Sequence, residues 1–213
     1  MKIDLYSDMV CPWCRIGKKN MSDAISAWEA STGETIEVNY HAYMLSHDLP
    51  PEGQPFNSAM EKKMGGPEKL RPMLQRVTEA GAAVGVTFNF DQVERMPHTE
   101  LAHRVTALLN TESQEIWLDA VMKAYFEDGR DIAQLSVLLE IADELGIDVE
   151  ALRQELDAGN GKEAVQDDFT TARNIGISGV PFFILDGKYA LSGAYPANQF
   201  LEAFQKIKQQ TQS

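Results

Sequence analysis

Both cysteines of this 213-residue chain lie in one short stretch, SDMVCPWCRIG, at residues 7–17. They are Cys11 and Cys14, with Pro12 and Trp13 between them. Two thiols at this spacing can alternate between a dithiol and a disulfide, or they can supply two of the four ligands of a structural zinc ion. They can also be two small buried residues with no chemical role.

The elements on either side of the cysteines favour redox chemistry. Residues 2–7 alternate apolar and polar side chains as a strand does, and residues 13–31 repeat apolar side chains at the spacing of a helix. Pro12 suits the first helical turn, because its missing N–H would have no partner there. Cys11 is therefore expected at the helix N-terminus, where unpaired N–H groups and the helix dipole stabilise a thiolate. Cys14 is expected one turn further in, close to Cys11 and less exposed.

These positions predict a role for each thiol. Cys11 is expected to attack a disulfide, and Cys14 to resolve the mixed disulfide by attacking Cys11. No cofactor is required, because the two sulfur atoms carry the electrons, although glutathione could act as a redox partner. The expected partners are thiol- or disulfide-containing proteins and small thiols.

The zinc interpretation would require two more ligands. His98 and His103, in HTELAH, offer an H-x4-H pair. However, His98 lies 84 positions beyond Cys14, whereas a zinc finger has a gap of about 12–15 residues. We therefore expect no metal site and interpret both residues as ordinary helix histidines.

Composition excludes several classes of function. A hydrophobic content of 44% and a charged content of 24% are typical of a globular protein, so disorder is expected only at the polar residues 209–213. The net charge of -13, without a basic stripe, argues against nucleic-acid binding. The first residues lack the apolar run of a secretory signal, and no segment has the ~18 apolar residues of a membrane span. A cytoplasmic protein with no membrane partner is expected.

The remaining patterns predict further elements. Alternation at residues 35–44 predicts a strand parallel to the first. Prolines and glycines between residues 46 and 72 predict a linker or lid with a short helix at residues 58–64, followed by nearly 100 helical residues. Asp186-Gly187 separates two β-rich runs and predicts a hairpin, which precedes a final amphipathic helix.

Several motifs together resemble those of the DsbA-like thioredoxin-fold oxidoreductases, and within them the FrnE-like branch. The motifs are CPWC at 11–14, DLPPEG at 48–53, AHR at 102–104, AYFEDGRDI at 124–132 and GISGVPFFILDGKYALSGA at 176–194. The resemblance covers nearly the whole chain. It implies an α/β, thioredoxin-like fold, in which a central mixed sheet flanked by helices is interrupted by an α-helical insertion. Residues 1–45 and 160–213 would form the thioredoxin-like domain, and residues 46–159 the insertion.

The resemblance also implies a cis peptide bond between Val180 and Pro181, packed against the cysteine turn. Because Pro181 has no N–H, the Val180 backbone would be free to pair with an extended substrate beside Cys11. A proline that begins an edge strand is the alternative. Pro12, Trp13, Val180 and Pro181 are therefore candidate substrate-binding or supporting residues around the two cysteines, and we expect Trp13 to be partly exposed.

The function implied is an enzyme, a thiol:disulfide oxidoreductase or isomerase. One alternative is a glutathione-dependent isomerase or transferase of the 2-hydroxychromene-2-carboxylate isomerase or kappa-class type, although such proteins typically carry serine in place of Cys11 and lack the second thiol. Another is a chaperone-like binding protein that uses a groove between the core and the helical insertion. The segment HAYMLSHD, at residues 41–48, departs from the family pattern.

Five other residues suggest secondary roles around the cysteines. Met9 and Met44 could form an adaptable apolar surface near the substrate groove. Arg15, Lys18 and Lys19 are expected to form a solvated helix face, with Arg15 available to hold a thiolate.

Overall fold

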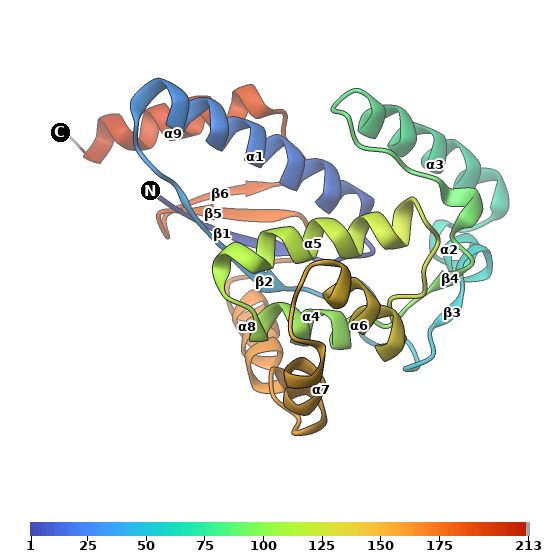
Figure 1. Ribbon diagram of the computed structural model, residues 1–213. Coiled ribbons are helices and arrows are strands. Elements are labelled where there is room, and N and C mark those ends of the chain that lie inside the picture. Colours follow the sequence, from blue (N-terminus) through green and yellow to red (C-terminus); the bar gives the residue numbers. More distant parts are fainter. Residues whose placement is uncertain (212–213) are drawn as a thin grey trace.

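A computed structural model describes residues 1–211, which form a four-stranded sheet, a two-stranded sheet and the helices around them (Figure 1). The larger sheet has the order β2-β1-β5-β6. Its strands are β1 (Lys2–Ser7), β2 (Glu37–Ala42), β5 (Phe182–Leu185) and β6 (Tyr189–Ser192). Strands β1 and β2 are parallel, whereas β5 is antiparallel to both of its neighbours. The predicted fold class, a mixed sheet flanked by helices, is confirmed.

Helix α1 (Pro12–Thr32) connects the two parallel strands. It ends at Gly33, whose φ of 71° lets its N–H bond to the carbonyl of Glu29. The predicted strand–helix–strand order is confirmed, with β2 shorter than the predicted 35–44.

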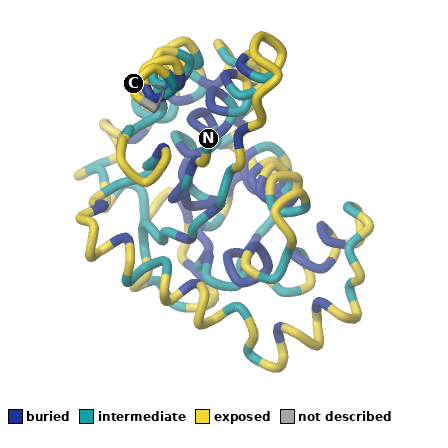
Figure 2. Tube along the Cα trace, turned by 90° about the vertical axis from the view of Figure 1, so that its left-hand side faces the viewer, coloured by how far each residue is buried: buried dark blue, intermediate teal, exposed yellow. Residues whose placement is uncertain are grey.

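One face of the sheet is covered by α1 and by α9 (Ala197–Thr211). Alternate residues of a strand point to opposite faces, and on this face Ile3, Leu5 and Phe183 are 0% exposed. They share one apolar core with side chains of the two helices. Figure 2 shows these strands as the buried centre of the molecule, with exposed residues along the outer sides of the helices.

The opposite face of the sheet is covered by α8 (Lys162–Asn174). A smaller apolar cluster forms there around Tyr6, Ala172 and Ile177. The same face carries charge, because Asp4 and His41 alternate with the residues that point toward α1.

The middle of the chain is mostly helical and continues the main apolar core. Its helices are α2 (Phe56–Met64), α3 (Pro67–Ala82), α4 (Glu100–Leu108), α5 (Thr111–Phe126), α6 (Leu135–Glu144) and α7 (Val149–Asp157). The predicted linker contains α2 and also β3 (Gln54–Pro55), which pairs with β4 (Arg95–Met96) ahead of α4; sequence patterns did not predict this pair. A short 3₁₀ helix occupies Phe90–Gln92. The domain boundaries after residues 45 and 159 stay a prediction.

The predicted hairpin is confirmed in the antiparallel pair β5–β6. Its turn residues, Asp186 and Gly187, have φ values of 49° and 67°, the left-handed conformations that a tight hairpin turn requires. Helix α9 continues through Thr211, so the disorder predicted from residue 209 is wrong for that part, and residues 212–213 lie outside the described chain. No helix within residues 1–211 is long and apolar enough to cross a membrane.

Candidate redox site

The two cysteines lie at the start of α1. Cys11 is the N-cap residue, with extended backbone angles, and its carbonyl accepts the N–H of Cys14 at 3.0 Å. Pro12 occupies the beginning of the helix, as predicted. Both cysteines are free thiols, and their exposures follow the predicted order, with 4% for Cys11 and 0% for Cys14.

The segment that precedes β5 reaches this turn from the other end of the chain. The Val180–Pro181 peptide bond is cis, Pro181 is buried, and Val180 is partly exposed. The Sγ atom of Cys11 donates a hydrogen bond to the Val180 carbonyl at 3.6 Å, a length that fits a sulfur donor. The site therefore brings together Cys11, Val180 and Pro181, although 169 positions separate Cys11 from Val180.

A glycine in the quoted stretch explains how closely α1 approaches this segment. A Cβ atom added to Gly17 would lie 2.9 Å from Cγ of Pro181 and 3.3 Å from Cζ of Phe183. Sequence reasoning gave Gly17 no role. The available signal was its position inside a helix, where glycine costs about 1 kcal/mol relative to alanine and is retained when packing requires it.

Burial separates the chemistry of the two thiols. It raises the pKa of the Cys14 thiol well above its usual range, and the neighbouring Cys11 adds to that effect. Cys14 is therefore protonated at neutral pH. Cys11 is the thiol that has a small solvent-exposed area.

A second buried titratable pair lies near the cysteine turn. Asp8 is 1% exposed, and its Oδ2 atom accepts the N–H of Leu45 at 2.8 Å. His103 is 3% exposed, and its Nε2 atom lies 3.6 Å from Oδ1 of Asp8. This Nε2 atom has no hydrogen-bond partner among the described residues. Sequence reasoning missed Asp8. The only feature that could have indicated it is that its carboxylate lies three positions before Cys11 in the sequence.

The two histidines considered as zinc ligands have different environments. His103 lies in α4, as a helix histidine should, whereas His98 lies in the loop before that helix, so the prediction is wrong for His98. In the part of the chain that the structure describes, no group of three or more His, Cys, Asp or Glu side chains could hold a metal ion.

Trp13 is partly exposed, as predicted. The guanidinium of Arg76, from α3, lies over its ring at 6.0 Å from the centroid, within the range of a cation–π interaction. Figure 1 shows α3 beside the N-terminal end of α1.

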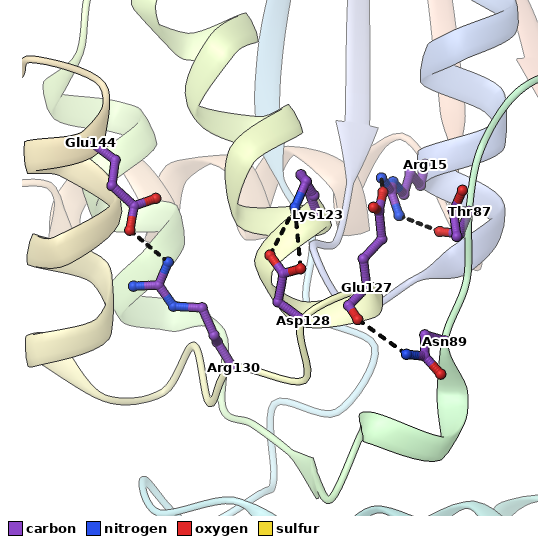
Figure 3. A network of polar contacts seen from close by, with 8 residues as sticks. All are labelled: Arg15, Thr87, Asn89, Lys123, Glu127, Asp128, Arg130 and Glu144. Carbon is purple, nitrogen blue, oxygen red and sulfur yellow. Dashed lines mark hydrogen bonds and ion pairs between the residues drawn. The ribbon is translucent and has the colours of Figure 1, made fainter.

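The prediction for Arg15 is wrong. Arg15 donates to the carbonyl of Thr87 at 2.6 Å and forms an ion pair with Glu127, whose own carbonyl accepts from Asn89 (Figure 3). Its charge is therefore directed toward the helical middle of the chain rather than toward a thiolate. The remaining contacts in Figure 3, between Lys123 and Asp128 and from Arg130 to Glu144, lie within that helical part.

Lys18 also departs from the predicted solvated face. It is 3% exposed, and its Nζ atom lies 2.8 Å from Asp119 and 3.3 Å from Glu115 on α5. Helix α5 packs on this side of α1 and supplies the carboxylates that compensate a buried ammonium. Lys19 is partly exposed, and it pairs with Asp23 one turn later.

The two methionines expected near a groove also differ. Met9 is 0% exposed and belongs to the main core, so that prediction is wrong for Met9. Met44 does line a groove, of about 730 Å³, between the loop after β2, helix α8 and the segment before α4. Ser178 lines the same groove and lies two positions before Val180.

Comparison with known proteins places this geometry in a family. The family described as DSBA-like thioredoxin domain matches residues 2–205. A probable DsbA oxidoreductase from Streptomyces coelicolor is 29% identical, with a TM-score of 0.87 over 97% of this chain and 89% of that chain.

Two more distant structures are alike in fold. A 2-hydroxychromene-2-carboxylate isomerase is 15% identical, with a TM-score of 0.71 over 99% of this chain and 98% of that chain. The cytosolic disulfide reductase DsbM from Pseudomonas aeruginosa, in a structure with GSH, is 21% identical, with a TM-score of 0.67 over 99% and 100%. From the match along nearly its whole length, the chain belongs to the DSBA-like thioredoxin domain family.

Proposed function

We propose that this protein is a thiol:disulfide oxidoreductase or isomerase in which Cys11 attacks and Cys14 resolves. The observation that carries the proposal is the placement of Cys11 as the N-cap of α1, with its sulfur 3.6 Å from the Val180 carbonyl and the fully buried Cys14 one turn behind it. A helix N-terminus stabilises a thiolate at Cys11. Burial raises the pKa of Cys14, so this thiol stays protonated until it attacks the mixed disulfide at Cys11.

The proposed reaction has two exchange steps. In the first, the Cys11 thiolate attacks one sulfur of a substrate disulfide, a bond forms between Cys11 and that sulfur, and the other substrate thiolate leaves. In the second, Cys14 gives its proton to the thiolate released in the first step and attacks the sulfur of Cys11. The bond between Cys11 and the substrate sulfur breaks, and the second substrate thiolate leaves. Two electrons pass from the protein dithiol to the substrate, and the reverse sequence oxidises a substrate dithiol.

Four neighbours of Cys11 are proposed to bind the substrate or to support the redox site. The carbonyl of Val180 is bonded to Cys11 in the free protein, so a substrate amide would replace that weak partner. Pro181 contributes no N–H that would compete for it. Trp13 offers a partly exposed ring, and Pro12 fixes the first turn of the helix on which Cys11 lies.

The first test is a glutathione redox titration that follows the Cys11–Cys14 disulfide by the mass shift on alkylation. A reversible two-electron transition is expected. A potential near or below about -270 mV would identify a reductant, and one above about -200 mV an oxidant or isomerase. Formation of glutathione adducts alone, with no intramolecular disulfide, would overturn the proposal.

Serine variants assign the two roles. Cys11→Ser is expected to abolish both reductase and oxidase activity, whereas Cys14→Ser is expected to retain the first step and to accumulate a mixed disulfide at Cys11. Mass spectrometry of the trapped species reads out the difference. Full activity in Cys11→Ser would show that the roles are wrongly assigned.

A glutathione-dependent isomerase or transferase is the second candidate, favoured by the likeness in fold to the isomerase and to DsbM. This candidate would be supported over the first by saturable glutathione binding that is retained in Cys14→Ala, together with an activity that does not depend on the redox potential of the buffer. We also propose that the protein acts in the cytoplasm, where thiols are kept reduced; fractionation of cells followed by immunodetection tests this.

A further inference from the structure

The cations of α1, α2 and α3 fall into two groups. Arg15 and Lys18, on α1, each have a carboxylate partner from the helical part of the chain. The cations of α2 and α3 are all exposed, and within residues 1–211 none of them forms an ion pair. They are Lys62, Lys63, Lys69, Arg71 and Arg76. The same two helices carry three carboxylates, Glu61, Glu68 and Glu79, so this part of an acidic protein has a positive balance.

Two of these cations share one flank of α3, and one of the two contacts the redox site. The buried residues Leu70 and Val77 define the inner side of the helix. Lys69 and Arg76, separated by seven positions, flank that side on one line, since seven residues make nearly two turns. Arg76 lies over the ring of Trp13, between the two cysteines. The pair therefore extends for about 10 Å along the helix, and its Arg76 end lies beside the active-site turn.

Resting on the proposed function, we propose that Lys69 and Arg76, the α3 cation pair, recruit disulfides that carry carboxylate groups to Cys11. The occupant fits by charge complementarity, because Arg76, which forms no ion pair within residues 1–211, lies over the ring of Trp13, two positions from Cys11, and Lys69 lies on the same flank of α3. With a net charge of -13, the protein as a whole repels such a substrate. At physiological salt, however, charges beyond about 8 Å are largely screened, so the nearest cations dominate the encounter.

The test uses three small disulfides that differ in charge: anionic glutathione disulfide, neutral bis(2-hydroxyethyl) disulfide and cationic cystamine. The rate at which each oxidises the reduced protein is measured near neutral pH and divided by the rate of the same probe with dithiothreitol. This division removes the intrinsic reactivity of the probe. The neutral probe reports the thiol chemistry, and the ratio of anionic to cationic rates reports the cation pair.

In the wild type, the normalised rate of glutathione disulfide is expected to exceed that of cystamine, and the excess should shrink as salt increases. Arg76→Glu is expected to lower the anionic-to-cationic ratio about tenfold, and Lys69→Glu combined with it to lower the ratio further. The rate with the neutral probe should change little.

Arg71→Glu is the matched control. Arg71 lies on the same helix, is exposed and forms no ion pair within residues 1–211. It lies five positions from Arg76, so it points about 140° away around the helix axis. Its substitution is expected to change the ratio by no more than about twofold. A second control combines Lys188→Glu with Lys206→Glu, at the far end of the sheet. It changes the net charge as much as Lys69→Glu with Arg76→Glu and should leave the anionic-to-cationic ratio unchanged.

Three outcomes would overturn the inference: a normalised cystamine rate equal to or above that of glutathione disulfide in the wild type, an equal loss with all three probes in Arg76→Glu, or an equal shift in Arg71→Glu. A failure of the proposed function looks different, because then even the neutral probe does not convert the cysteines to a disulfide.

Discussion

The two faces of the four-stranded sheet stabilise the same strands in different ways. Toward α1 and α9 the contacts are apolar, and Phe183 packs edge-on against Phe200 with ring centroids 4.9 Å apart. Toward α8 the apolar cluster is small, and Asp4 and Asp168 both contact the ring of His41. One face therefore depends on packing, whereas the other depends on hydrogen bonds whose strength changes with protonation.

The redox site lies where these two faces meet. Pro181 approaches Gly17 on the α1 side, whereas Val180 packs against the main core and also against the cluster around Ile177 on the α8 side. The position of the cis segment relative to Cys11 thus depends on both faces. The comparison can be tested with substitutions on each.

The largest effect is expected for Phe183→Ala. Phe183 is 0% exposed, and truncation of a buried phenylalanine costs about 3–5 kcal/mol in free energy of unfolding. The neighbouring Phe182→Ala is the matched control, because Phe182 points to the α8 face and is only partly buried; a loss below about 2 kcal/mol is expected there. Denaturant unfolding of the reduced proteins measures both, and equal losses would contradict the difference between the faces.

A smaller effect is expected where α1 meets Pro181. Gly17→Ala improves helix propensity by about 1 kcal/mol, but the added Cβ would meet Pro181 at 2.9 Å. Overpacking of this kind costs about 1–3 kcal/mol, so a net loss is expected. The loss should be accompanied by slower exchange with a neutral disulfide, because Pro181 lies beside Cys11.

Gly179→Ala provides the control for that substitution, since a Cβ at Gly179 meets nothing within 4 Å. It is expected to change the free energy of unfolding by less than about 1 kcal/mol. A stabilised Gly17→Ala protein with normal exchange would mean that the segment before β5 moves freely away from α1.

Gly17 also shows which features sequence could predict. The cysteine turn, α1 and the β5–β6 hairpin are encoded locally, by side-chain spacing, by Pro12 and by Asp186-Gly187. The approach of Gly17 to Pro181 joins residues from opposite ends of the chain, and no pattern in either segment specifies it.

The same limit explains the errors for the basic residues. Lys18 lies four positions after Cys14 on α1. Which side of this helix is exposed cannot be predicted without knowing which other helices pack against it. Its partner Asp119 is 101 positions away, on α5. An isolated ammonium is costly to bury, so local sequence favours an exposed position until the compensating carboxylates are known.

The smallest expected effect concerns His41, on the α8 face. Its Nδ1 atom lies 2.6 Å from Asp168 and its Nε2 atom 3.3 Å from Asp4. Burial alone would lower the pKa of His41, but the two carboxylates outweigh it, and the pKa is raised above its ordinary value of 6.5. A raised pKa in the folded state means that the stabilisation is present in full below that ordinary value and is lost as pH rises through the folded pKa.

The measurement is the free energy of unfolding of wild type and His41→Gln as a function of pH. We expect the wild type to be more stable by about 1 kcal/mol on the acid side, the usual size for a partly exposed hydrogen bond with a charged partner. The difference should fall as pH rises through neutrality. Tyr6, stacked on His41 at 4.6 Å, does not titrate in this range, because burial and the two carboxylates raise its pKa.

His47→Gln is the control for the pH series, because His47 is exposed and forms no ion pair within the described residues. It should leave the pH dependence unchanged. A difference for His41→Gln that grows with rising pH would mean that burial of a neutral imidazole stabilises this face. The α8 face would then depend on packing, like the face toward α1, and the contrast between the two would not hold.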